Sequence, residues 1–170
     1  LGILMTEIIR LDLENRLYLQ LKDGRVVIDL MPNIAPKHVT RIKELAREKL
    51  YDGIVFHRVI DGFMAQTGDP SGTGMGGSSK PNLEAEFSNT PHEKGVLSMA
   101  RASEPNSANS QFFIVLEESR FLDSKYTVFG KVAEGMEYVE KIKKGDAKKN
   151  GSVESPDKII SLSVASDVKE

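Results

Sequence analysis

Leu17-Tyr18-Leu19-Gln20-Leu21-Lys22-Asp23-Gly24-Arg25-Val26-Val27-Ile28-Asp29-Leu30 carries the clearest structural pattern in the chain. Its leucines alternate with Tyr18, Gln20 and Lys22, which is the period-2 pattern of a strand with one buried face. Asp23-Gly24 follows at once, and this pair accepts the positive φ angles of a tight primed turn. The β-branched run after it then predicts the second strand of a β-hairpin.

Further extended runs and two helical patterns follow the hairpin. Pro36–Lys49 places its apolar residues on one helical face and begins with a proline, which suits a first helical turn. A shorter helix is predicted over Gly135–Lys144. Six more strands are predicted over Ile54–Ile60, Phe63–Thr67, Gly95–Ala100, Gln111–Leu116, Thr127–Val132 and Lys158–Ala165. Eight strands with only two helices favour a mainly β fold, a closed eight-stranded antiparallel β-barrel capped by two α-helices.

Length and composition limit what this fold can do. We expect residues 1–170 to form a single domain with its core at about 17–165. Met5 is a candidate natural start, which would make residues 1–4 a remnant. The net charge of −2 argues against nucleic-acid or membrane partners. The chain has no cysteine, which excludes disulfides and is compatible with the cytoplasmic location that we expect.

The familiar catalytic patterns are weak or missing in this sequence. His38, His57 and His92 show no metal-ligand spacing, and we expect structural or surface roles for His38 and His92. No serine lies in a Gly-x-Ser-x-Gly elbow. Gly72–Gly77 matches Gly-x-Gly-x-x-Gly, but no amphipathic helix follows it. A loop whose glycines permit close backbone approach is therefore the better interpretation than a nucleotide site.

Polar residues inside the predicted strands are more informative. Arg58 interrupts an apolar strand, Gln66 shares a face with Met64, and Gln111 shares a face with Phe113. A surface on which a guanidinium and amides border Phe and Met side chains fits a peptide-binding groove. The residues alone equally allow Arg58 to pair with a carboxylate and the amides to cap loops.

A resemblance to a known family decides between these two interpretations. It is carried by blocks of sequence that occur in the same order. Phe56–Ile60, Gly62–Asp69 and Gly72–Gly74 resemble the signature region of the cyclophilins, a family of peptidyl-prolyl cis–trans isomerases. The match continues in the same order through Ser98–Ala100, Asn106, Ser110–Ile114, Val128–Val132 and Glu134–Met136. It spans roughly Leu17 to Leu162, which is nearly the whole chain.

The resemblance implies an enzyme that rotates Xaa-Pro peptide bonds without metal or organic cofactor and assists protein folding. Arg58 is implied as the catalytic guanidinium, and Phe63, Met64, Phe113 and Leu122 as the proline pocket. The residues implied to hold or border the peptide are Gln66, Gly74, Ala100, Arg101, Ala102, Gln111, Phe121 and Tyr126. The implied partners are proline-containing peptides and unfolded protein clients. The sequence does not determine the oligomeric state, and a monomer is the default expectation.

Three of these positions depart from the commoner cyclophilin pattern. Many members have Trp at Phe121, His at Tyr126 and Asn at Arg101, and the first two departures are similar to bacterial members. Phe121 lacks an indole N–H donor, so we expect weakened affinity for cyclosporin A. The family contact at Arg101 is through the backbone, and its side chain is expected to add positive charge beside the groove.

Two other functions remain alternatives at this point. One is a binding module that uses a cyclophilin fold to hold proline-containing segments as a chaperone or scaffold. A nucleotide-dependent enzyme is the more distant alternative. The presence of Arg58 beside a predicted apolar pocket favours catalysis.

Overall fold

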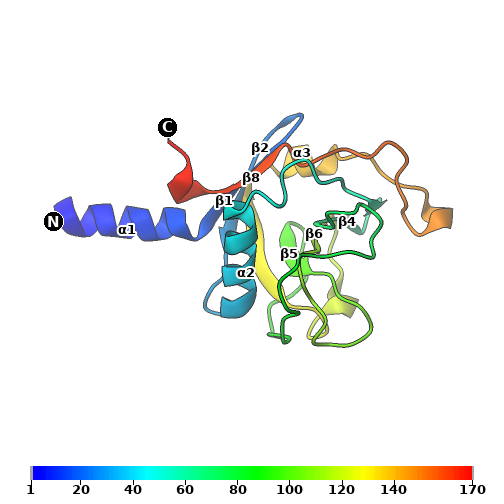
Figure 1. The fold of residues 1–170 in the computed structure, drawn as a ribbon, viewed down its shortest axis with the longest axis horizontal. Coiled ribbons are helices and arrows are strands. Elements are labelled where there is room, and N and C mark those ends of the chain that lie inside the picture. Colours follow the sequence, from blue (N-terminus) through cyan, green and yellow to red (C-terminus); the bar gives the residue numbers. More distant parts are fainter. Residues whose placement is uncertain (1, 170) are drawn as a thin grey trace.

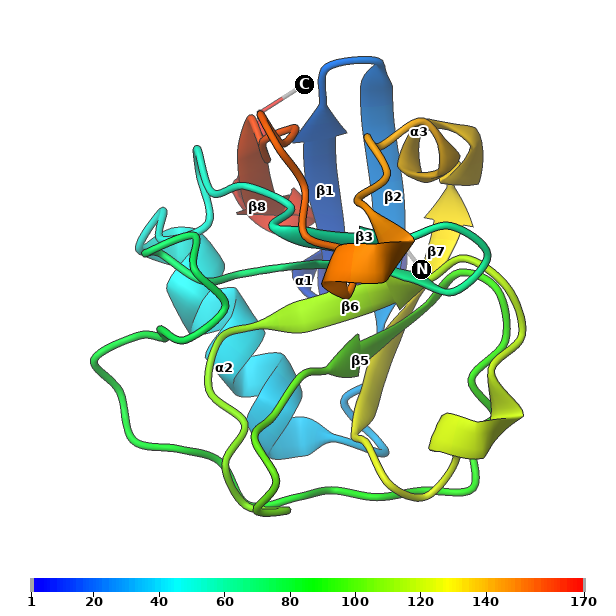
Figure 2. The same ribbon diagram turned by 90° about the vertical axis from the view of Figure 1, so that its right-hand side faces the viewer.

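The structure is a computed structural model that describes residues 2–169. Its eight strands form one antiparallel sheet in the order β3-β4-β6-β5-β7-β2-β1-β8, curled around a core (Figure 2). The strands are β1 (Arg16–Leu21), β2 (Gly24–Leu30), β3 (Arg58–Ile60), β4 (Met64–Thr67), β5 (Val96–Met99), β6 (Phe112–Val115), β7 (Val128–Glu134) and β8 (Ser161–Val164). The helices are α1 (Gly2–Glu14), α2 (Pro36–Arg47) and α3 (Met136–Glu140), with short 3-10 turns at Arg120–Leu122, Ala147–Lys149 and Ala165–Asp167.

The predicted hairpin is confirmed. β1 and β2 pair from Arg16↔Asp29 to Leu21↔Gly24, so Lys22-Asp23 occupies the turn and Gly24 already belongs to β2. The predicted primed turn at Asp23-Gly24 is therefore wrong, and neither of these two residues has a positive φ. Leu17, Leu19 and Leu21 are all buried, as the alternation predicts. β1 also pairs with β8, so the first and the last strand along the chain are neighbours in the sheet.

All eight predicted strands occur, although β3 is shorter than the predicted Ile54–Ile60 and β8 is shorter than the predicted Lys158–Ala165. The prediction of a closed barrel is wrong for the hydrogen bonding of this sheet. Among residues 2–169 no ladder joins β3 to β8, and these two strands stand at the ends of the sheet order. The outer edge of β3 is instead occupied by a loop: Val59 N–H donates to Gly151 O at 2.9 Å, and Gly145 N–H donates to Val59 O at 2.8 Å. The two ends do meet through the segment that precedes β3: Val55 bridges Lys158, and the N–H of Leu162 in β8 donates to Asp52 Oδ1 at 3.0 Å. The curled sheet is therefore an incomplete barrel by its hydrogen bonding.

The predicted helix over Pro36–Lys49 is confirmed as α2. Pro36 is its first residue, and Val39, Ile42, Leu45 and Ala46 form its buried face. No local side chain caps its N-terminus. Glu86 does so from a distant loop, accepting the N–H of Lys37 at 3.2 Å and that of His38 at 2.9 Å. α3 is shorter than predicted, because the chain leaves the helix at Lys141.

α1 was not predicted, and it adds a third helix. Figure 1 shows it projecting away from the sheet, with the N-terminus at its far end. Leu4, Met5 and Ile9 on it are more than half exposed. It is anchored at its C-terminal end, where the Glu14 carboxylate accepts from Arg47 at 2.8 Å and from Lys43 at 3.3 Å. No helix of residues 2–169 has the length and apolar content to cross a membrane.

Two hydrophobic clusters lie on opposite faces of the sheet. In β6, Phe112 and Ile114 belong to the main cluster inside the curl, whereas Phe113 and Val115 belong to a smaller cluster outside it. Met64 of β4 also faces outward into that smaller cluster. This explains why β6 is buried along its whole length instead of alternating with solvent. The outer face of β4, β5 and β6 is thus an apolar surface on which a site can be built.

Candidate active site

A hollow of about 280 Å³ lies over the outer cluster. Met64 and Phe113 from adjacent strands are almost fully buried and form its floor. Its rim contains the exposed ring of Phe121, which lies 5.4 Å from the ring of Phe63. The residues that line this apolar hollow are Arg58, Phe63, Met64, Gln66, Ala100, Arg101, Phe113, Phe121, Leu122 and Tyr126. All ten were singled out from the sequence.

Arg58 enters this hollow from β3. Its register partner across the sheet is Gln66 of β4, so the two side chains stand side by side. Arg58 Nη1 donates to Gln66 Oε1 at 3.1 Å. No carboxylate pairs with Arg58 among the residues that the structure describes. Partial burial lowers the pKa of the Arg58 guanidinium, with an opposing contribution from Tyr126, and an arginine remains charged at physiological pH.

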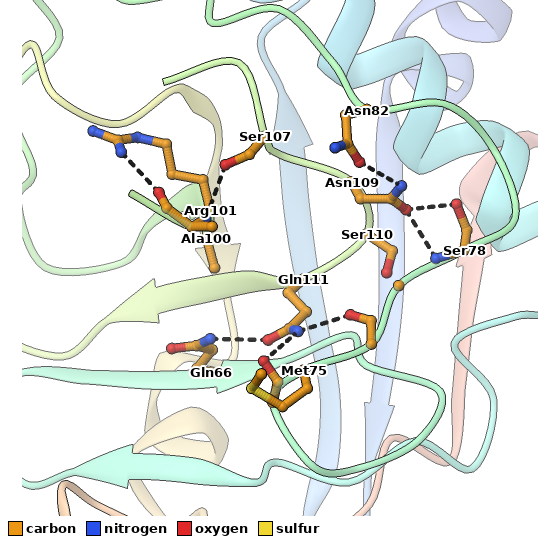
Figure 3. A pocket seen from close by; sticks show the side chains of 14 residues that line it. Gln66, Met75, Ser78, Asn82, Ala100, Arg101, Ser107, Asn109, Ser110 and Gln111 are labelled. Atoms are coloured by element: carbon orange, nitrogen blue, oxygen red, sulfur yellow. Dashed lines mark hydrogen bonds between the residues drawn. The ribbon is translucent and has the colours of Figure 1, made fainter. Parts of the chain in front are cut away.

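The glutamines continue this hydrogen-bonded row across the site (Figure 3). Gln66 Nε2 donates to Gln111 Oε1 at 3.0 Å. Gln111 Nε2 then donates to the backbone oxygens of Gly74 at 3.0 Å and Gly76 at 2.9 Å. Because each amide has an acceptor on one side and a donor on the other, the row fixes which way both amide groups face.

A second hollow of about 490 Å³ adjoins the first and shares Gln66, Ala100 and Arg101 with it. The remaining three predicted residues, Gly74, Ala102 and Gln111, line this second hollow. Figure 3 shows Asn109 on its wall, accepting from the side chain and the backbone N–H of Ser78. The structure thus gathers every predicted site residue into two connected hollows.

Asp69 organises the glycine-rich loop at residues 72–77, a role that the sequence pattern did not predict. Its buried carboxylate accepts the N–H groups of Gly74 at 2.7 Å, Gly76 at 3.0 Å and Ser71 at 2.8 Å. Burial would raise the pKa of Asp69, but the hydrogen bonds from Gly76, Ser71 and Gly74 outweigh it and lower that pKa to about 2. These N–H groups are therefore occupied by an internal anion, which argues against phosphate binding at this loop.

The buried histidines are structural, as predicted for His38 and His92. His38 is fully buried, with Nδ1 at 2.5 Å from Glu86 Oε1. His92 is equally buried and lies between Asp123 Oδ1, 3.0 Å from Nδ1, and Ser98 Oγ, 2.9 Å from Nε2. Burial is the main cause that lowers the pKa of both. Ser98 of this Ser-His-Asp arrangement is buried and inaccessible to a substrate. The arrangement therefore has a packing role beneath Phe113, on whose ring His92 stacks.

The side chain of Arg101, and not only its backbone, takes part in the site. Its guanidinium donates to Lys125 O at 2.7 and 3.1 Å and to Ala102 O at 3.0 Å. It also lies 4.6 Å from the centre of the Tyr126 ring, which packs edge-on against Phe113. The side chain therefore ties two segments on either side of the apolar hollow together, and much of its charge is directed at carbonyl oxygens.

Asn150 is a site residue that sequence reasoning missed. Arg58 Nε donates to Asn150 O at 3.0 Å, and Arg58 Nη2 donates to Asn150 Oδ1 at 3.2 Å. The only local signal is Asn150-Gly151, a pair typical of a left-handed turn, and it does not reveal a partner in β3. Among the described residues, no group of histidine and carboxylate side chains is suited to hold a metal ion.

Comparison with known proteins agrees with this geometry. The family model for cyclophilin type peptidyl-prolyl cis-trans isomerases matches residues 16–164. A probable peptidyl-prolyl cis-trans isomerase of Brucella suis is 52% identical, over 93% of this chain and 86% of its own length. Peptidyl-prolyl cis-trans isomerase B of Bacillus subtilis is 44% identical, over 81% of this chain and 96% of its own length.

Solved structures show the same fold. Cyclophilin AquaCyp293 from Hirschia baltica superimposes with a TM-score of 0.83 at 31% identity, covering 93% of this chain and 76% of the other. A cyclophilin type isomerase of Cryptosporidium parvum, crystallised in the presence of the dipeptide Ala-Pro, gives a TM-score of 0.80 at 29% identity, covering 88% and 98%. The chain accordingly belongs to the cyclophilin-type peptidyl-prolyl cis–trans isomerases, with close relatives among bacteria.

Proposed function

We propose that this enzyme rotates Xaa-Pro bonds by Arg58-assisted deconjugation of the amide inside the apolar hollow. The observation that carries the proposal is a guanidinium on the wall of an apolar hollow, held by neutral oxygens and paired with no carboxylate among the described residues. An arginine whose charge was neutralised by an internal carboxylate would not stabilise the deconjugated amide in this way. The relative crystallised with Ala-Pro supports a proline-containing ligand for the same fold.

The energetics require no covalent step. Rotation must overcome an amide barrier of ~18–20 kcal/mol, and uncatalysed exchange takes roughly 10–100 s. A turnover near 10³ s⁻¹ needs about 10⁵-fold acceleration, or ~7 kcal/mol. Hydrogen bonding and solvation that differ between the planar and the twisted amide are of this order when several contributions combine.

Arg58 favours the twisted amide through its free hydrogens. A guanidinium has five N–H groups, and three are used by Asn150 O, Asn150 Oδ1 and Gln66 Oε1. One N–H therefore remains on each terminal nitrogen. As the amide twists, the proline nitrogen regains its lone pair and can accept one of them, so the deconjugated form is stabilised more than the planar one.

The apolar floor contributes by holding the proline ring and solvating the dipolar planar amide poorly. Met64, Phe113, Phe63 and Leu122 supply this surface. Gln66, Gln111 and the backbone at Ala100–Ala102 hold the peptide on one side while the other side turns. Proline-containing segments of unfolded proteins are the proposed clients, and assistance to folding is the proposed role.

We further propose that the sheet closes into a barrel in solution. Gly53 N–H donates to Ile159 O at 2.7 Å, and Ile159 N–H donates to Ile54 O at 2.8 Å. These bonds join the segments that precede β3 and β8, beside the loop that covers the edge of β3, and the proposed closure consists of their persistence in solution. Hydrogen exchange tests this: amides of Gly53 and Ile159 as protected as those of β1 support closure, whereas exchange at loop rates contradicts it.

The main proposal is tested with Arg58→Ala and Arg58→Lys. Catalytic efficiency towards an Ala-Pro peptide, measured by exchange NMR, should fall ~10²-fold or more in the alanine variant, and lysine should rescue little because it lacks the rigid fork. Near-normal isomerisation by Arg58→Ala would refute the assignment. Retained client holding by an otherwise inactive Arg58→Ala would instead favour the scaffold function.

A further inference from the structure

The segment Gly145–Ser152 closes over the outer edge of β3, next to the proposed catalytic arginine. Gly151 O and Gly145 N–H hydrogen-bond to Val59, and Val153 N–H donates to His57 O at 3.2 Å. This places a loop from the last quarter of the chain against residues 57–59. The side chain between those two anchoring points is Arg58.

The loop's backbone is constrained to approach this closely. A Cβ on Gly151 would lie 2.5 Å from Ile60 Cγ1, and a Cβ on Gly145 would lie 1.9 Å from Gly151 O. Asn150 between them has a φ of 56°, in the left-handed region, where asparagine is better tolerated than most residues. The turn is therefore fixed by packing on both sides, and it presents both oxygens of Asn150 to one neighbour.

That neighbour is the side edge of the Arg58 guanidinium. Asn150 O accepts from Nε and Asn150 Oδ1 accepts from Nη2, so Asn150 alone binds two N–H donors of Arg58. Gln66 Oε1 accepts from Nη1 on the other side. All three acceptors are neutral, so they fix the plane of the guanidinium without cancelling its charge.

Resting on the function proposed above, we propose that Asn150 is a positioning residue for Arg58. It sets the rotation of the guanidinium plane, so that the one free N–H on each terminal nitrogen is directed to the twisting amide. A loose arginine would spend part of its time in orientations that offer no donor to the proline nitrogen. The role is exerted through Arg58, and Asn150 need not touch the peptide.

Asn150→Gly is the sharpest test, because glycine keeps the left-handed turn and the backbone oxygen while removing the side chain that carries Oδ1. We expect kcat/KM for an Ala-Pro peptide to fall about tenfold, mainly through kcat, while the urea midpoint stays within error. Ser155→Gly is the matched control: Ser155 also has a positive φ, 48°, is exposed, and lies outside both hollows. It should leave both quantities unchanged.

A double-mutant cycle separates positioning from a general structural effect. If Asn150 acts through Arg58, Asn150→Gly should cause no further loss in an Arg58→Ala background. Asn150→Gly should also broaden or shift the Arg58 Nε–H resonance in ¹⁵N NMR. Asn150→Asp should restore that resonance but not full kcat, because its carboxylate would offset the positive charge.

The outcomes distinguish the two proposals. Unchanged kcat in Asn150→Gly, or an equal loss with and without Arg58, overturns the positioning role while leaving the role of Arg58 intact. Near-normal activity in Arg58→Ala alone overturns the proposed mechanism itself.

Discussion

Asp69→Asn should loosen the glycine-rich loop while leaving the sheet in place. The substitution removes the negative charge and sets an NH₂ group among backbone donors, two of which, Gly74 and Gly76 N–H, share the same oxygen. The pKa of Asp69 is about 2 in the folded protein against 3.8 ordinarily. At 1.36 kcal/mol per pKa unit, the folded state favours the charged form by about 2.5 kcal/mol. Asp69 is only 1% exposed, so solvent screens little of this.

The pH dependence identifies the charge as the cause. Because the folded pKa is depressed, the stabilisation is complete well above 3.8 and is lost as pH falls through about 2. Asp69→Asn should thus lower the free energy of unfolding by about 2 kcal/mol or more at pH 7, and about 1 kcal/mol of this gap should close by pH 3. Urea titrations followed by far-UV circular dichroism suit a chain without tryptophan.

Asp61→Asn is the control, since Asp61 is exposed on the turn before β4. It should change stability by less than about 0.5 kcal/mol. A gap between wild type and Asp69→Asn that is the same at pH 7 and pH 3 would refute the electrostatic reasoning. So would a loss no larger than that of the control. KM for peptide should also rise, because the loop oxygens that hold Gln111 would move.

Three further predictions concern other contacts. Phe121→Trp restores an indole N–H and should tighten cyclosporin A binding about tenfold by calorimetric titration; unchanged or weaker binding would remove Phe121 as the explanation. Arg101→Asn removes the tie to Lys125 O and should raise KM severalfold with little change in kcat in steady-state assays, and a change confined to kcat would contradict it. Glu86→Ala uncaps α2 and leaves buried His38 without its acceptor, so the free energy of unfolding should fall by about 2 kcal/mol in urea titration, and an unchanged midpoint would exclude the capping role.

Local patterns predicted the parts of the fold that local physics decides. The alternating leucines and the turn-forming residues after them predict the first hairpin because one buried face and a tight turn act within 14 residues, although the turn lies at Lys22-Asp23 and not at Asp23-Gly24. Pro36 and the apolar face after it predict α2 for the same reason. The site residues were found through the resemblance, and the structure gathers them into two hollows. Their individual roles, the cytoplasmic location and the monomeric state stay predictions.

What the sequence did not reveal depends on distant or solvent-exposed contacts. α1 leaves Leu4, Met5 and Ile9 exposed, so no core imposes the pattern by which buried helices are recognised. The open order of the sheet arises because a loop, not β8, covers β3. Asn150 is 92 positions from Arg58, and neither residue's neighbours indicate the other.

The pairing of β1 with β8 has a consequence for biosynthesis. Leu17 meets its partner Val164 only after the whole stretch between these two residues has left the ribosome. At roughly 5–20 residues per second, the outer edge of β1 stays unpaired for on the order of 10 s. During that interval the nascent enzyme is itself an incompletely folded chain with an open strand, exposed to the same hazards as the proteins it is proposed to help.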